Sequence, residues 1–88
     1  MKNIFSIVKD ILENAVIENE YYKIESNKLI INPTRLFNSY YEYFQGTQII
    51  LLSKTDFFKS LKTSPEFVEY KSSVRFKKNN TSAFIFKM

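Results

Sequence analysis

The first apolar pattern of the chain has the periodicity of a helix. Between Asn3 and about Glu18, apolar residues recur every three or four positions, with polar residues between them. This spacing predicts an amphipathic helix whose apolar stripe packs into the core. A groove for a partner helix is the alternative interpretation of the same stripe. Its members are Ile4, Ile7, Val8, Ile11, Leu12, Ala15 and Val16.

The next stretch, Tyr21 to Ile31, has the composition of extended backbone. Ser26 and Asn27 are turn residues within it, so the stretch allows a small hairpin, and Leu29–Ile31 is its better supported strand. The two adjacent tyrosines at its start have two interpretations. They are either packed residues of the core or rim, or platforms on which nucleic-acid bases stack.

A second helix is predicted from Pro33 to Phe44. Asn32 is a favourable N-cap, and proline is well suited to the first helical position. Gly46, the only glycine of the chain, is expected to end the helix in a left-handed conformation. The apolar run Gln48–Leu52 follows, as a short strand or as a buried connection. The apolar face of the helix consists of Leu36, Phe37, Tyr40, Tyr41 and Phe44.

A third, shorter helix is predicted from Lys54 to Thr63. Ser53 is its N-cap, Asp56 stands three residues further on, and Pro65 prevents its continuation. Its apolar stripe is Phe57, Phe58 and Leu61, and by the same spacing the opposite side carries Thr55, Lys59, Lys62 and Thr63.

The remainder of the chain has the pattern of a hairpin. Polarity alternates over Phe67–Lys77, which predicts a half-buried strand, and Ala83–Lys87 returns as a second strand. The turn between them is expected at Lys78–Thr81, because asparagine tolerates left-handed backbone. The predicted buried side is Val68, Tyr70, Val74 and Phe76, and the predicted exposed side is Glu69, Lys71, Ser73, Arg75 and Lys77.

The order of these elements predicts the fold class. Helix, strand, helix, helix, strand, basic turn and strand is the connectivity of a winged helix, an α+β fold of three helices with a small antiparallel sheet and a C-terminal β-hairpin wing. A chain of 88 residues is expected to form one domain, residues 1–88. Lys54–Thr63 is then the recognition helix, and Lys77–Thr81 is the tip of the wing.

Charge is distributed unevenly along the chain, whose formal net charge is +4. Residues 1–44 contain five Lys or Arg and six Asp or Glu, whereas residues 45–88 contain eight and three, a net of +5. The basic half is the half with the third helix and the hairpin, which indicates an anionic partner. The alternative is that the chain is rich in Lys, Asn, Ile, Tyr and Phe because an AT-rich genome encodes such a composition without selection for binding.

Catalysis is not expected. The chain has no His and no Cys, which removes the commonest general base, the thiol nucleophile and the usual transition-metal ligands. Its nine carboxylates are scattered among lysines, so we expect no enzyme, no cofactor and no metal site. Neither a signal peptide nor an apolar run of membrane-spanning length is present, which predicts a cytoplasmic protein without membrane contact.

The amino-acid sequence of residues 29–88 resembles that of a known family. The second helix contains "PTRLF…Y…F", the third contains "LSKTDFF…L", and the hairpin contains "VRF…FIF". These patterns are similar to the C-terminal winged-helix domains of primase–helicases and replication initiators encoded by bacteriophages, plasmids and mobile genomic islands. The resemblance implies DNA binding in the DNA replication of such an element. Family members also carry an ATPase motor, and this chain has no GxxxxGK[ST] phosphate loop, so a detached domain, a fragment or a small stand-alone protein is expected.

Nucleic acid, single- or double-stranded, is the expected partner of a monomer or weak dimer. The recognition helix lacks Arg, Asn and Gln, the best readers of base edges, so contact with the phosphate backbone should dominate. The alternative is a protein-interaction module that docks on a replication enzyme, another copy of itself or an acidic surface without binding DNA. The predicted DNA-binding residues are Thr55, Lys59, Lys62, Thr63, Arg75, Lys77, Lys78, Asn79 and Asn80.

Overall fold

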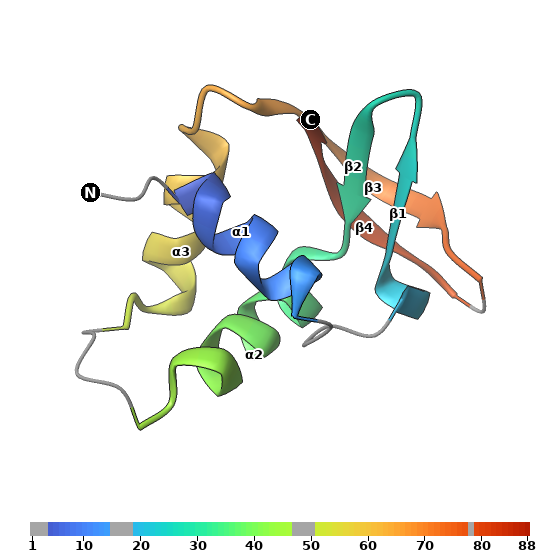
Figure 1. Ribbon diagram of the computed structural model, residues 1–88. Helices are drawn as coiled ribbons and strands as arrows, with labels where there is room; N and C mark the ends of the chain where they lie inside the picture. Colours follow the sequence, from blue (N-terminus) through green and yellow to red (C-terminus); the bar gives the residue numbers. More distant parts are fainter. Residues whose placement is uncertain (1–3, 15–18, 47–50, 78) are drawn as a thin grey trace.

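The computed structural model describes residues 4–14, 19–46, 51–77 and 79–88 (Figure 1). This part of the chain forms an α+β fold of three α-helices, one 3₁₀ turn and a four-stranded antiparallel sheet. In chain order the elements are α1 (Ile4–Glu13), η1 (Asn19–Tyr21), β1 (Tyr22–Glu25), β2 (Lys28–Ile31), α2 (Pro33–Phe44), α3 (Lys54–Lys62), β3 (Phe67–Arg75) and β4 (Asn80–Lys87). The predicted α+β class is therefore confirmed, and the layout is compatible with a winged helix.

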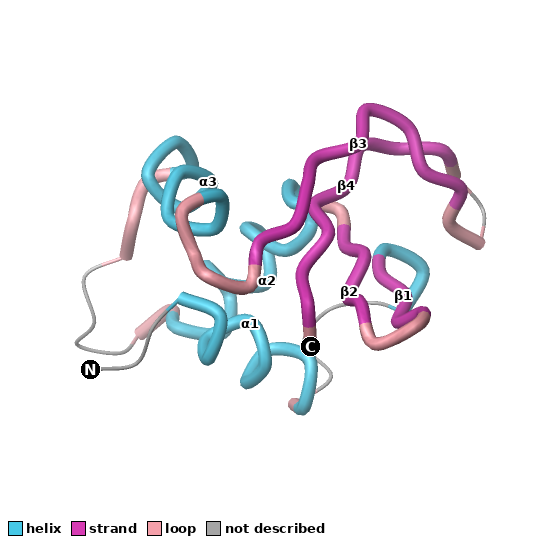
Figure 2. Tube along the Cα trace, turned by 90° about the horizontal axis from the view of Figure 1, so that it is seen from above, coloured by secondary structure: helices cyan, strands magenta, loops and turns pink. Residues whose placement is uncertain are grey.

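The helices lie on one side of the sheet, whose strand order is β1-β2-β4-β3 (Figures 1 and 2). Alternate residues of the two central strands, Leu29 and Ile31 in β2 and Phe84 and Phe86 in β4, are buried against the helices. Burial of this aromatic and aliphatic surface is what stabilises a small chain that has no disulfide. The helices contribute Phe5, Val8, Ile11, Leu36, Tyr40, Phe57 and Leu61 to the same core.

Helix α1 places its apolar stripe in the core, as the first interpretation of the pattern predicted. Val8 and Ile11 are fully buried, and the ring of Phe5 lies 5.4 Å from that of Phe86 between centroids. The helix ends at Glu13, and Asn14 forms a turn. The rest of the predicted helix, residues 15–18, lies outside the described residues.

The hairpin of β1 and β2 is present. Its two turn residues, Ser26 and Asn27, have φ values of 51° and 61°, the combination that a type I′ turn requires. Strand β2 begins one residue before the predicted Leu29. Tyr21 and Tyr22 are partly buried against the core, and the guanidinium of Arg35 lies 4.4 Å from the ring centroid of Tyr21. The adjacent tyrosines are therefore packed residues.

Helix α2 has the predicted bounds. The Asn32 side-chain oxygen accepts a hydrogen bond from the backbone N–H of Arg35 at 2.9 Å, which caps the helix. Gly46 has the expected left-handed conformation, with φ of +84°. Of the apolar run that follows, residues 48–50 lie outside the described residues. Leu51 and Leu52 are a partly buried connection, and the N–H of Leu52 donates to the hydroxyl of Tyr40 at 2.9 Å.

Strand β3 departs from the prediction of a half-buried strand. Val68 and Tyr70, predicted to be buried, are 37% and 52% exposed. β3 is an edge strand, and its register on β4 shifts between Phe67 and Glu69 and again between Lys71 and Val74. Each bulge inserts an unpaired residue and reverses the side on which the following side chains lie. Strict alternation therefore fails over most of the strand.

The turn of the β3–β4 hairpin lies earlier than predicted. The strands pair as far as Arg75 with Asn80, and the N–H of Phe76 donates to the carbonyl of Asn79 at 2.8 Å. Asn80 and Thr81 therefore belong to β4 and not to the turn, while Lys78 lies outside the described residues. Phe76 is buried, as predicted, at 3% exposure. None of the described helices has the length and apolar character needed to cross a lipid bilayer.

Candidate nucleic-acid interface

The outward side of α3 is set by the two residues that anchor the helix. Phe57 and Leu61 are fully buried, and the Ser53 hydroxyl accepts a hydrogen bond from the N–H of Asp56 at 3.2 Å and caps the first turn. Thr55, Lys59, Lys62 and Thr63 are exposed, whereas Phe58 is half-buried against the core. These five residues line a shallow hollow of about 510 Å³.

Beneath the hollow, the ring of Phe84 connects α3 to the sheet. The ring of this buried β4 residue lies 5.6 Å from that of Phe58 and 5.8 Å from that of Tyr70, centroid to centroid. The ammonium nitrogen of Lys62 lies 5.6 Å from the same ring centroid, within the range of a cation–π contact. Helix α3 and the middle of β3 therefore meet over one aromatic ring. We call Thr55, Phe58, Lys59, Lys62 and Tyr70 the α3–β3 face.

The positive charges of the α3–β3 face are not neutralised by described carboxylates. The ion pairs found among the described residues, Lys23 with Glu25 at 3.6 Å and Lys71 with Glu69 at 3.7 Å, lie elsewhere. Lys59 and Lys62 are exposed and take part in neither. Their charges are thus available to an anion, and an exposed pair on one helix suits the phosphates of a polyanion.

The two threonines among the predicted DNA-binding residues, Thr55 and Thr63, differ in whether their hydroxyl is engaged within the helix. The hydroxyl of Thr63 lies 3.0 Å from the carbonyl of Lys59 and 3.2 Å from that of Ser60, and it donates within its own helix end. A hydroxyl has a single proton, so this engagement leaves Thr63 as an acceptor toward a ligand. Thr55 is exposed in the first turn of α3, where the helix dipole favours a negative group.

The residues at the tip of the β3–β4 hairpin lie away from α3. Arg75, Lys77, Asn79 and Asn80 are exposed, but the tip lies at the β1 end of the sheet, at the opposite end of the molecule from α3 (Figures 1 and 2). The Lys23 ammonium of β1 donates to the carbonyl of Arg75 at 3.2 Å and holds the tip there. The predicted DNA-binding residues of α3 and those of the hairpin tip therefore do not share one surface among the described residues, and Lys78 lies outside them.

The physical cause of this separation is the curl of the hairpin. Bulges increase the local twist of a strand, and β3 has two register shifts. The curl also explains why Phe76, Ala83 and Ile85 are buried although they belong to no part of the helix-facing core. Burial of Phe76 directs the tip back over the sheet, away from α3.

Two members of the α3–β3 face were not assigned to it from the sequence. Phe58 was placed in the apolar stripe of the helix, although it follows Phe57 directly. Phe58 does pack against the core, but neighbouring residues on a helix point about 100° apart, so it is only half-buried and also reaches the hollow. This offset was visible in the sequence. Tyr70 had no such indicator, because its exposure follows from the position of β3 at the edge of the sheet.

The α3–β3 face brings basic, hydroxyl and aromatic side chains together. Such a combination is one that contacts phosphate and base in nucleic-acid-binding proteins. Among the described residues, no group of three His, Cys, Asp or Glu side chains is placed to hold a metal ion.

In comparisons with known proteins, no family model, no curated protein and no solved structure matches the chain.

Proposed function

We propose that the protein binds nucleic acid through the α3–β3 face, mainly by contacts with the phosphate backbone. The observation that carries the proposal is the hollow along α3, where Lys59 and Lys62 stand beside Phe58 without a described carboxylate partner. Two cations one helical turn apart match the repeated charge of a polynucleotide.

The order of the elements supports a winged-helix type of DNA binding, in which α3 is the recognition helix. Strand β1 is then an addition that extends the sheet beyond the usual first strand, represented here by β2. The resemblance of residues 29–88 to winged-helix domains of primase–helicases and replication initiators supports a role in replication of a phage, plasmid or other mobile element. The tip of the hairpin is not part of the proposed contact.

The test is the salt dependence of binding to fluorescently labelled oligonucleotides, followed by anisotropy. The variant Lys59→Gln/Lys62→Gln removes two charges from the face. The matched control Lys28→Gln/Lys87→Gln removes the same charge from two exposed lysines that pair across β2 and β4.

Each phosphate contact contributes roughly 0.9 to the slope of log affinity against log salt on duplex and roughly 0.7 on a single strand. We expect the face variant to lower the slope by about 1.8 on duplex or about 1.4 on a single strand, relative to the control. Equal slopes for the two variants would refute the assignment of these lysines. A complex with a protein that persists in high salt, with no binding to either oligonucleotide, would favour the protein-interaction alternative.

A further inference from the structure

Strand β1 is a regular edge of the sheet, and among the described strands none pairs with its outer side. Tyr22 to Glu25 pair with Ile31 to Lys28 without a register shift. The N–H of Asn32 donates to the carbonyl of Tyr21 at 2.9 Å, so position 21 is bonded toward β2. In an antiparallel pair this orientation alternates, and positions 23 and 25 are bonded inward as well. The N–H and C=O groups of Tyr22 and Ile24 therefore point away from the sheet.

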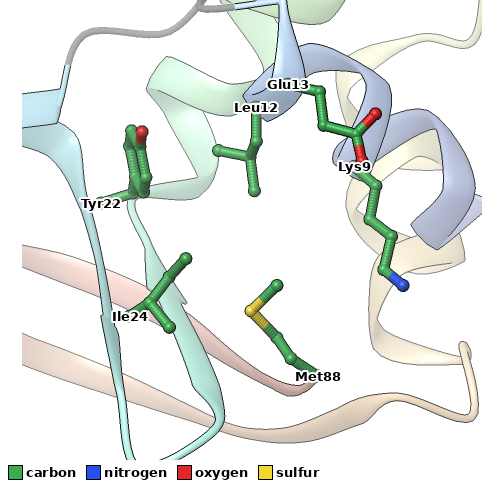
Figure 3. A pocket seen from close by; sticks show the side chains of 6 residues that line it. All are labelled: Lys9, Leu12, Glu13, Tyr22, Ile24 and Met88. Atoms are coloured by element: carbon green, nitrogen blue, oxygen red, sulfur yellow. The ribbon is translucent and has the colours of Figure 1, made fainter.

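The side chains beside this edge are apolar and open to solvent. Ile24 is 54% exposed and Met88 is 50% exposed. With Leu12 and Tyr22 they surround a depression of about 340 Å³, which Lys9 and Glu13 of α1 border (Figure 3). A strand edge with free backbone groups beside an exposed branched apolar residue is a surface to which another strand can add. The opposite edge, β3, is interrupted by its two register shifts.

We propose that two copies of the chain associate through β1, antiparallel, with Ile24 opposite Ile24 of the partner subunit. Each Ile24 then donates its N–H to the other's carbonyl, and the two isoleucine side chains meet on the helix-facing side of the joined sheet. The sheet of one copy continues into that of the other, and an isologous interface closes on itself without forming a filament.

The charges of β1 select this partner and this register. With Ile24 at the centre, Lys23 faces Glu25 of the partner subunit, and Glu25 faces the partner's Lys23. These are non-hydrogen-bonded pairs, in which side chains stand closest. The neighbouring register that also matches the free backbone groups places Ile24 opposite Tyr22 of the partner subunit, and it sets Lys23 directly against the partner's Lys23, which is destabilising. Strand β1 is thus complementary to itself in one arrangement.

The proposed interface is small, because β1 has only four residues. Interfaces below about 1,200 Å² are typical of weak and transient association, so the dimer should form in a concentration-dependent manner. The interface leaves the α3–β3 face uncovered, because β3 is the other edge of the sheet. The proposal is therefore independent of nucleic-acid binding.

The oligomeric state of the isolated protein and of charge-reversal variants, measured by analytical ultracentrifugation up to millimolar concentration, tests the proposal. Lys23→Glu and Glu25→Lys each place like charges opposite one another in the two-fold pair, and we expect each alone to weaken association about tenfold or more. In an equimolar mixture of the two variants, position 23 of each copy faces an opposite charge at position 25 of the other. We expect the mixture to associate at least as well as the wild type.

Rescue in the mixture separates the proposed contact from a loss of folding, and circular dichroism of each variant checks the fold. Glu25→Lys removes the ion pair of Lys23 with Glu25 in the same chain but keeps both groups of the contact between Lys23 and the Arg75 carbonyl, so rescue in the mixture is the deciding result. A wild type that is monomeric at millimolar concentration would overturn the proposal. So would a mixture that stays monomeric, or a Glu25→Lys variant that associates like the wild type.

Discussion

The side chain of Asn32 links α2 to β4, and its replacement gives the most informative stability prediction. The side chain is 7% exposed. Its oxygen accepts from the N–H of Arg35 at 2.9 Å, and its amide nitrogen donates to the Thr81 hydroxyl and the Ser82 carbonyl, each at 3.0 Å. One residue therefore caps α2 and fastens it to β4.

The expected loss of stability follows from these bonds. The cap contributes about 1 kcal/mol, and each net hydrogen bond of the amide contributes about 1 kcal/mol. We expect Asn32→Ala to lower the free energy of unfolding by about 3 kcal/mol. Asn32→Ser keeps a capping oxygen but is too short to reach β4, so its expected loss is about 2 kcal/mol. The backbone hydrogen bond from Asn32 to Tyr21 is retained in both variants.

Urea unfolding followed by circular dichroism measures these differences, with the m-value showing that the extent of unfolding is unchanged. The reasoning requires the order wild type, serine variant, alanine variant. If the serine variant were as stable as the wild type, the bonds to β4 would contribute nothing. Surface substitutions usually change the free energy of unfolding by less than about 0.5 kcal/mol. If the alanine variant lost no more stability than that, the account of this residue would be refuted.

The remaining predictions concern α2 and the binding face. Tyr40→Phe should lower the free energy of unfolding by about 1 kcal/mol, because it preserves the stack on Phe57 but leaves the Leu52 N–H without its hydrogen-bond partner. The control is Tyr41→Phe, at a 49% exposed position, which should leave stability unchanged, and equal stability of the two variants would contradict the prediction. Gly46→Ala should lower the free energy of unfolding by roughly 1–2 kcal/mol because φ is +84°, although no atom beyond the adjacent residues lies within 4 Å of the added Cβ. An unchanged Tm in a thermal melt would contradict this and show that the turn relaxes. Tyr70→Leu should weaken single-strand binding by about tenfold through loss of stacking, with an unchanged salt slope in anisotropy titrations; a changed slope would mean that the residue acts through charge.

Local chemistry accounts for the elements that were predicted correctly. Asn32 and Pro33 set the start of α2, and Gly46 has the left-handed backbone expected after its end, so that helix follows from its own residues. The turn at Ser26 and Asn27 likewise defines the β1–β2 hairpin. In each case the information lies within a few residues of the feature that it determines.

The features that were not predicted depend on contacts between distant segments. Tyr70 is exposed because β3 is the edge strand of the sheet, and the place of the hairpin tip follows from the burial of Phe76 and from Lys23, 52 residues before Arg75. The alternating pattern of β3 contains no indication of either. The lysines of α3 were predicted because helical spacing is local, whereas their separation from Arg75 and Lys77 was not.

The most direct test of the binding face is a map of amide chemical shifts. The ¹⁵N-labelled protein is titrated with a short single strand and with a short duplex at low salt. We expect the largest changes at Thr55, Lys59, Lys62 and Tyr70, with the amides of β1 unmoved. Changes confined to the hairpin tip, or no change with either oligonucleotide, would contradict the proposed function.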